Sequence, residues 1–477
     1  MKQLGICKKI SIFICFILVC YFIVGFTFNQ SDAYAFANSS GDVFDKIDAY
    51  LSDATVKAHF PAMSVTIVDK ENVLFSKSYG NCENTDTPFL LGSVSKSFTA
   101  LCIMQLVEQG KIDLDSNISV YLYDATDGDK ITVRQLLNHT SGLGEHQNLE
   151  NYRIVNKQGI HVYANVNYSL LGKIIEAVSN KSYEIYVTEN VFNPLQMFNS
   201  AASLEKSAEN GLIGGYENWF GVNTKTSAKY SPKTNAWITM SAGYLSASTA
   251  DLAKYLQMYL NGGQGIVSSE SINKMFYENV SVNAAIPYSY GMGWTLINEP
   301  LKEPALRHSG LVETGMSVIY ILPKSEIGVA IAVNTNDYFV GKDLMDRIDW
   351  SVALMLMGDK PNQISSSEYV TRHLMYDIIY FVAIAIAVVP LCLLRIYIKR
   401  LKRGRLALKI VLIALLHVVL PIFILLLSQI AFSTPLWVVR AFVPDMFVTV
   451  VISSALLFTG GITKAVILLL KHKQGEC

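Results

Sequence analysis

Ser93 and Lys96 are the residues whose types and spacing best fit nucleophilic catalysis. They form a Ser-x-x-Lys element at the start of an apolar stretch that we expect to be a helix over 93–109. Helical residues three apart share a face, so the amine can lie beside the hydroxyl. A serine needs a base to remove its proton, and burial lowers a lysine pKa toward that role. The helix start also offers unpaired N–H groups where an oxyanion would form.

The Ser-x-x-Lys pattern is weak by itself, because it recurs at 203–206 and 271–274. We interpret the lysines of those two copies as surface residues of helices. That interpretation is disfavoured for Lys96, because an apolar stretch surrounds it.

Two further elements carry side chains that could complete a site. Tyr163-Ala164-Asn165 precedes a predicted apolar helix, and a tyrosine near a buried cation can ionise more easily and act as a base. His308-Ser309-Gly310 stands just before a strand predicted from Ser317, and its glycine would let the backbone approach a substrate closely. The competing interpretations are a packed loop tyrosine and a solvated loop histidine.

The pattern around these elements predicts an α+β domain in which the terminal strands pair in one antiparallel sheet, flanked by the terminal helices. An all-helical region fills the middle. The expected helices are 41–57, 93–109, 250–260 and 342–355, and the expected strands are 63–68, 73–79, 317–322 and 328–333.

Composition excludes several classes of function. The 39 basic and 39 acidic residues cancel, so nothing indicates a nucleic-acid partner. The seven cysteines form neither a disulfide framework nor a CxxC site, and the eight histidines are scattered. We therefore predict no metal and no cofactor. The mean hydropathy of +0.31 is unusual for a soluble protein.

Both ends of the chain are apolar. Three lysines precede the run 10–28, and Ala33-Tyr34-Ala35 resembles a cleavage site, so we predict a signal peptide or signal anchor over 1–35. Near the C-terminus, three apolar stretches are each long enough to cross a hydrocarbon layer of ~30 Å. They span 378–398, 410–432 and about 446–470.

Basic residues cluster between the first two of these stretches and again after the third, which places both segments in the cytoplasm. The sequence thus predicts an extracytoplasmic domain over 36–358, a linker over 359–375, and three membrane helices with a cytoplasmic tail over 376–477. His417 lies inside the second span, and we expect a neutral histidine that faces a neighbouring helix.

Several motifs in this order resemble the serine β-lactamase and penicillin-binding-protein superfamily, in particular its class C β-lactamase-like branch. The likeness covers roughly 42–357 and implies a β-lactamase/transpeptidase-like fold. Besides the three elements above, it rests on 110–114, 133–143, 241–246 and 290–294.

The resemblance also implies roles. Ser93 would be acylated, and Lys96 and Tyr163 would share the proton transfers, with the identity of the base left open. Asn165 would orient the substrate amide, and the N–H groups of Ser93 and Leu311 would bind the oxyanion. His308, with Ser309 and Gly310, would line the substrate site.

One departure bears on the substrate. The family's β-lactamases usually carry Lys-Thr-Gly where this chain has His-Ser-Gly, and a histidine there is more similar to D-aminoacyl peptidases and esterases. We therefore expect a serine hydrolase for small D-amino-acid peptides or acyl amides, in contact with membrane lipid. An exported domain with three membrane helices also resembles prodrug-activating peptidases that remove an N-acyl-D-asparagine cap. The alternatives are an esterase or β-lactamase, and a non-catalytic penicillin-binding sensor.

Overall fold

The computed structural model describes residues 42–226, 237–283, 285–299, 301–401 and 406–473. The predicted signal segment over 1–35 lies outside the described residues.

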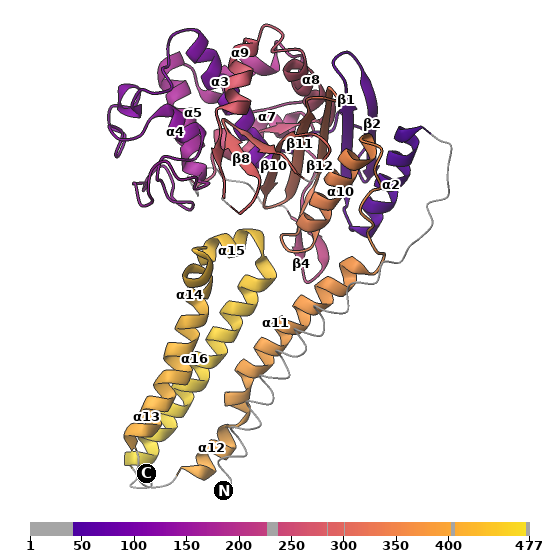
Figure 1. Ribbon diagram of the computed structural model, residues 1–477. Helices are drawn as coiled ribbons and strands as arrows, with labels where there is room; N and C mark the ends of the chain where they lie inside the picture. Colours follow the sequence, from indigo (N-terminus) through magenta and orange to yellow (C-terminus); the bar gives the residue numbers. More distant parts are fainter. Residues whose placement is uncertain (1–41, 227–236, 284, 300, 402–405, 474–477) are drawn as a thin grey trace. The chain divides into compact units, whose positions relative to one another are not determined.

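An eight-stranded antiparallel sheet forms the centre of the domain, in the order β2-β1-β12-β11-β10-β9-β8-β7 (Figure 1). The predicted pairing of the terminal strands is confirmed, with Met63 opposite Val333. The strands are β1 (Ala62–Val68), β2 (Val73–Gly80), β7 (Val280–Ser281), β8 (Tyr288–Gly291), β9 (Trp294–Ile297), β10 (Ala305–Val312), β11 (Gly315–Leu322) and β12 (Ile327–Val333).

Successive side chains of β1 face opposite sides of the sheet, and helices cover both sides. Val65 and Ile67 belong to the same apolar cluster as residues of α2 (Val43–Lys57) and α10 (Gly341–Leu356). Thr66 points to the other face, where its hydroxyl contacts that of Thr249 at the start of α8 (Thr249–Leu260). Successive side chains of a strand face opposite sides, so one strand serves both layers.

The central helix of the all-helical region is α3 (Ser95–Glu108), which is buried without interruption from Ser95 to Leu106. A helix that is buried on every side must be surrounded by other elements, and neighbouring helices surround α3. The remaining helices of the domain are α4 (Val133–Leu137), α5 (Asn165–Ser179), α6 (Tyr183–Val187), α7 (Leu204–Glu209) and α9 (Ser269–Tyr277). Short helical turns are η1 (Gly92–Val94), η2 (Ile118–Val120), η3 (Thr188–Phe192) and η4 (Met240–Tyr244).

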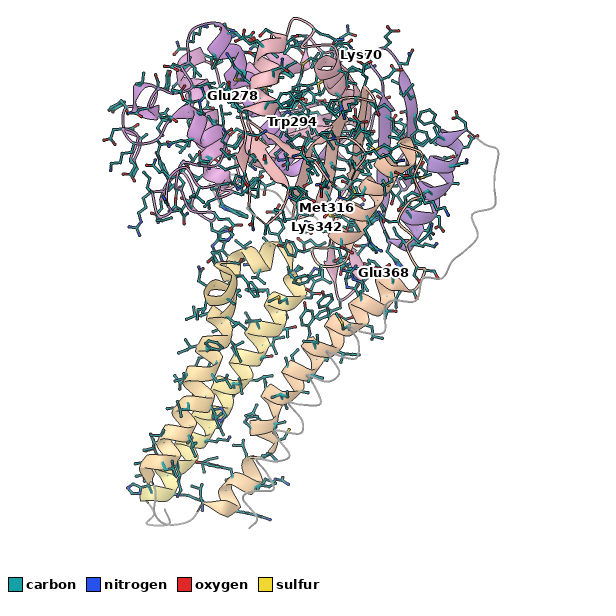
Figure 2. All side chains as sticks on the ribbon, in the orientation of Figure 1. Lys70, Glu278, Trp294, Met316, Lys342 and Glu368 are labelled. Carbon is teal, nitrogen blue, oxygen red and sulfur yellow. The ribbon has the colours of Figure 1, made fainter. Side chains whose placement is uncertain are left out.

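Two small sheets complete the domain. One joins β13, β4 and β5, and the other pairs β3 with β6. Their strands are β3 (Phe89–Leu90), β4 (Tyr216–Trp219), β5 (Val222–Lys225), β6 (Ser246–Ala247) and β13 (Thr335–Asn336). Trp294, which is 1% exposed, lies in the interior among the side chains drawn in Figure 2.

Strand β10 corrects the sequence prediction. His308, Ser309 and Gly310 were expected in a loop before a strand, but they lie in the middle of β10, between β9 and β11. Polar residues inside a central strand hide its alternating pattern from the sequence. Strand β11 pairs with Leu306 to Val312, including all three of these residues, whereas β9 pairs only with Ala305 to Arg307.

Three helical segments in the described part of the chain are long and apolar enough to cross a membrane: Glu368–Lys399, Leu406–Phe432 and Pro444–His472. They overlap the three predicted spans. The first begins at Glu368, labelled in Figure 2, so the second half of the predicted linker 359–375 is helical. The helices are α11 (Glu368–Cys392), α12 (Leu394–Arg400), α13 (Leu406–Ala414), η5 (Leu415–Val419), α14 (Leu420–Phe432), α15 (Leu436–Phe442) and α16 (Pro444–Lys473).

Candidate active site

Ser93 lies in the turn η1, immediately ahead of α3 rather than inside it. Two glycines bring this turn against β10. A Cβ on Gly92, whose φ is +52°, would lie 2.4 Å from the backbone nitrogen of Leu311. A Cβ on Gly310 would lie 1.9 Å from the carbonyl oxygen of Leu91 and 2.9 Å from the backbone nitrogen of Ser93. The close approach that requires Gly310 is therefore to this turn, and not to a substrate as the sequence suggested.

The same packing gathers two backbone nitrogens beside the serine. Leu311 follows Gly310 in β10, and its nitrogen faces Gly92. The nitrogen of Ser93 faces Gly310 across the same contact. The two N–H groups that the resemblance assigned to an oxyanion hole thus come from two segments held together by their glycines.

The amine of Lys96 lies beside the Ser93 hydroxyl, as the helical spacing predicted. Its Nζ is 3.1 Å from Ser93 Oγ, 2.8 Å from Asn165 Oδ1 and 2.6 Å from the carbonyl oxygen of Ala242. The side chain is fully buried, and this burial lowers the pKa of Lys96 well below its usual value.

The three contacts of Lys96 are all with oxygen atoms, and burial favours the neutral amine. The oxygens of Asn165 and Ala242 can only accept, so each takes one N–H of Lys96. The nitrogen lone pair of a neutral amine is then free to face Ser93 Oγ and to receive its proton. Lys96 therefore has the position of a general base, and burial shifts its equilibrium toward the neutral amine that such a base needs.

Tyr163 completes the group around the nucleophile. Its phenol hydrogen-bonds Ser93, and its ring centroid lies 4.9 Å from Lys96 Nζ. Burial raises the pKa of Tyr163, and its hydrogen bond with Ser93 only partly opposes this. The sequence argument considered a neighbouring cation that would ease its ionisation, whereas burial has the largest effect on the pKa of this phenol. Tyr163 carries its proton and is suited to donate it.

Asn165 begins α5 and reaches the same centre. Its amide oxygen accepts from Lys96, which leaves the amide NH₂ as the group able to face a substrate carbonyl. Asn165 thus orients the lysine in addition to the substrate role that the resemblance implied.

His308 is a buried strand residue, 4% exposed, and not a solvated loop histidine. Its Nδ1 donates to the carbonyl oxygen of Gly293 at 2.5 Å. Burial lowers the pKa of His308 to about 3, against the opposing effect of its hydrogen bond to Gly293. The imidazole is therefore neutral, with its Nε2 lone pair available as an acceptor. Ser309 is exposed on the opposite side of the strand.

Two groups were missed by the sequence argument. The Ala242 carbonyl holds Lys96, although the segment 241–246 was recognised only as a motif without a role. His139 lies against Tyr163, with ring centroids 4.3 Å apart. It also belongs to a recognised motif, and the motif itself was the signal that could have pointed to it.

Comparisons with known proteins agree with this geometry. The family model described as Beta-lactamase matches residues 45–354, and the chain belongs to that family. The resemblance found in the sequence is thus confirmed. Protein flp of Staphylococcus aureus (strain MRSA252) is 27% identical over 338 residues, which cover 64% of this chain and 65% of that protein. The match therefore spans just under two thirds of the length of this relative.

Solved structures share the fold. A penicillin-binding protein homologue from Pyrococcus abyssi is 28% identical, with a TM-score of 0.59 over 69% of this chain and 80% of that chain. A D-stereospecific amidohydrolase from Streptomyces sp. is 20% identical, with a TM-score of 0.53 over 62% and 94% of the two chains. A class C beta-lactamase is 17% identical, with a TM-score of 0.56 over 69% and 99%. The last two likenesses show the fold alone.

Proposed function

We propose that this chain is a membrane-anchored, extracytoplasmic serine hydrolase that cleaves amide bonds of small D-amino-acid-containing peptides or acyl amides through an acyl-enzyme. The observation that carries the proposal is the position of Ser93 Oγ, 3.1 Å from the buried amine of Lys96 and hydrogen-bonded to Tyr163. A nucleophile, a neutral base and a protonated acid meet at one point.

Each of these side chains has its own part in the proposed acylation. Neutral Lys96 takes the proton of Ser93 as Oγ bonds to the substrate carbonyl carbon, and the carbonyl oxygen becomes an oxyanion. The N–H groups of Ser93 and Leu311 stabilise that charge. The phenol of Tyr163 then donates its proton to the leaving nitrogen, the C–N bond breaks, and the proton on Lys96 returns to the phenolate. The product is an ester on Ser93 and a free amine.

Deacylation repeats the sequence with water. Neutral Lys96, through Tyr163, removes a proton from water, whose oxygen attacks the ester carbonyl. The oxyanion again lies against the two backbone N–H groups, and Ser93 Oγ leaves with the proton. The neutral His308 beside this centre supplies an uncharged acceptor where the family's β-lactamases carry a lysine, which supports a substrate without a β-lactam carboxylate at that point.

The location rests on two sequence signals and on the three apolar helices. The basic residues between the first two helices favour the cytoplasm for that connection, which leaves the catalytic domain outside. Cell-wall stem peptides and exported acyl peptides are the D-amino-acid amides available to an enzyme outside a bacterial-type membrane. One of the structural matches is by name a D-stereospecific amidohydrolase.

The test compares the purified full chain with its Ser93→Ala variant on N-acyl-D-amino-acid amides, including N-acyl-D-asparagine amides, with the L-isomers as matched controls. We expect hydrolysis of D-isomers by the wild type and none by the variant. Equal rates on both isomers would contradict the proposed specificity.

The alternatives give different results in the same assay. Faster turnover of a chromogenic ester or a β-lactam than of any amide would identify an esterase or β-lactamase. Intact mass after exposure to penicillin distinguishes the sensor, because a sensor keeps the adduct on Ser93 and an enzyme releases it.

A further inference from the structure

His139 is a buried histidine to which the mechanism above assigns no role. It follows α4 and is 1% exposed. Its φ is +56°, a left-handed conformation that is uncommon for a residue with a side chain. A backbone held in this conformation inside the domain needs contacts that stabilise it.

Those contacts lie on both sides of Tyr163. The carbonyl oxygen of His139 accepts the backbone N–H of Val162 at 2.8 Å. The ring Nδ1 of His139 accepts the backbone N–H of Ala164 at 3.2 Å. The ring itself packs on the ring of Tyr163, with centroids 4.3 Å apart. One residue therefore binds the residue before the tyrosine, the residue after it and the tyrosine ring.

A second donor fixes the tautomer of His139. Ser141 donates its hydroxyl to Asn167 Oδ1 at 2.6 Å, so the amide NH₂ of Asn167 faces His139 Nδ1 at 2.9 Å. Two donors thus converge on Nδ1, which must carry a lone pair, and the proton lies on Nε2. Burial keeps the pKa of His139 well below its usual value, so the imidazole stays neutral.

We propose that His139 is a positioning residue that holds the phenol of Tyr163 against Ser93. This inference rests on the proposed function, in which Tyr163 moves protons to and from the leaving group. A misplaced proton donor lowers the rate of the chemical step, whereas substrate binding depends on other groups. The effect of losing His139 must therefore pass through Tyr163.

The test is a double-mutant cycle of His139→Asn and Tyr163→Phe, read as the rate of Ser93 acylation by a β-lactam, whose leaving nitrogen needs a proton, followed by intact mass. Asparagine tolerates the left-handed backbone and keeps an acceptor near Nδ1, but it lacks the ring. We expect His139→Asn to slow acylation about 10- to 100-fold with an unchanged KM. In the Tyr163→Phe background, the same substitution should change the rate less than about twofold.

His59→Asn is the matched control. His59 is also a histidine with a left-handed backbone, at φ +54°, but its ring stacks on Tyr369, away from the catalytic group. We expect acylation by this variant to stay within about twofold of the wild type. His139→Ala, which removes both ring and acceptor, should be slower than His139→Asn, and thermal unfolding of every variant reports whether it is folded.

The outcomes separate the two proposals. A wild-type chain that never acylates at Ser93 overturns the proposed function and this inference with it. If the wild type acylates but the effects of the two substitutions on the acylation rate multiply in the double variant, this inference alone is overturned. A His139→Asn variant that has the wild-type unfolding temperature and acylates at the wild-type rate also overturns it.

Discussion

Lys96 and Lys464 both reach toward neighbours in apolar parts of the chain, and their settings differ. Lys96 directs its amine at a serine hydroxyl, an amide oxygen and a backbone carbonyl, drawn from η1, α5 and η4. Lys464 lies in α16, within the third apolar segment, and directs its amine at His417 Nε2 at 3.0 Å. One amine therefore meets a nucleophile, and the other meets an imidazole.

His417 shows how the second pair is built. Its Nδ1 donates to the carbonyl oxygen of Leu457 at 2.7 Å, so its Nε2 carries the lone pair that accepts from Lys464. The histidine lies in the turn η5 and contacts α16, as the sequence predicted for a neutral residue facing a neighbouring helix. A Cβ on Gly461 would lie 2.3 Å from the Cβ of His417, so glycine permits this close packing.

The difference teaches what makes a buried lysine a candidate base. Lys96 is fully buried whereas Lys464 is only half-buried, and at Lys96 two fixed acceptors leave the third direction of the nitrogen facing a hydroxyl. At Lys464 the acceptor is itself a side chain of the neighbouring helix, and the pair links two helices. We interpret the first site as catalytic and the second as a contact between helices.

The largest expected effect is that of Ser93→Ala. Without the hydroxyl no acyl-enzyme can form, so the rate of amide hydrolysis should fall by about 10⁴-fold or more. The measurement is turnover of the preferred D-amino-acid amide, together with intact mass after labelling. A variant that keeps a measurable adduct would place the nucleophile elsewhere.

The second effect is the pH dependence of acylation. Burial lowers the pKa of Lys96, so the reactive neutral amine accumulates as pH rises through that lowered value. The rate constant kcat/KM should therefore rise with pH along a limb well below the usual lysine value of 10.5 and then level off. A limb found only near the usual value would show that the neutral amine of Lys96 is not the base.

A smaller effect is expected at the helix pair. Gly461→Ala forces the α16 backbone away from His417, which should cost about 1–3 kcal/mol of stability. The free energy of unfolding in detergent measures this loss. Hydrolysis by the folded fraction should stay at the wild-type rate, and a parallel loss of kcat would show that the two sites are coupled.

The smallest effect is expected from Lys464→Met, which removes the donor to His417. Hydrogen bonds between membrane helices contribute about 0.6 kcal/mol on average, so the loss of stability should be of that order. Catalysis should not change. If this variant instead abolished hydrolysis while remaining folded, the interpretation of Lys464 as a contact between helices would be wrong.

Much of the fold could be predicted from the sequence because its elements have regular periods. The hairpin of β11 and β12, the helices α2, α8 and α10, and the three apolar segments all lie close to their predicted bounds. Strand β10 was missed, because Arg307, His308 and Ser309 interrupt its apolar pattern. Its identity as a strand depends on neighbours that lie elsewhere in the chain.

The candidate site also has one part that the sequence predicted and one part that it did not. The spacing of Ser93 and Lys96 is local, and a single helical turn brings them together, so the sequence predicted it. The acceptor role of the Ala242 carbonyl and the contacts of His139 are not local, and neither follows from residue type. The sequence argument did not predict the raised pKa of Tyr163 either, because burial depends on packing.

The sequence by itself determined the family, the candidate nucleophile, its neighbouring lysine and the three apolar helices, because each depends on residue types at short spacing. Only the tertiary structure decided the direction in which the pKa of each group shifts. Protonation follows from burial and from the direction of hydrogen bonds, and both are set by segments that meet only after the chain folds.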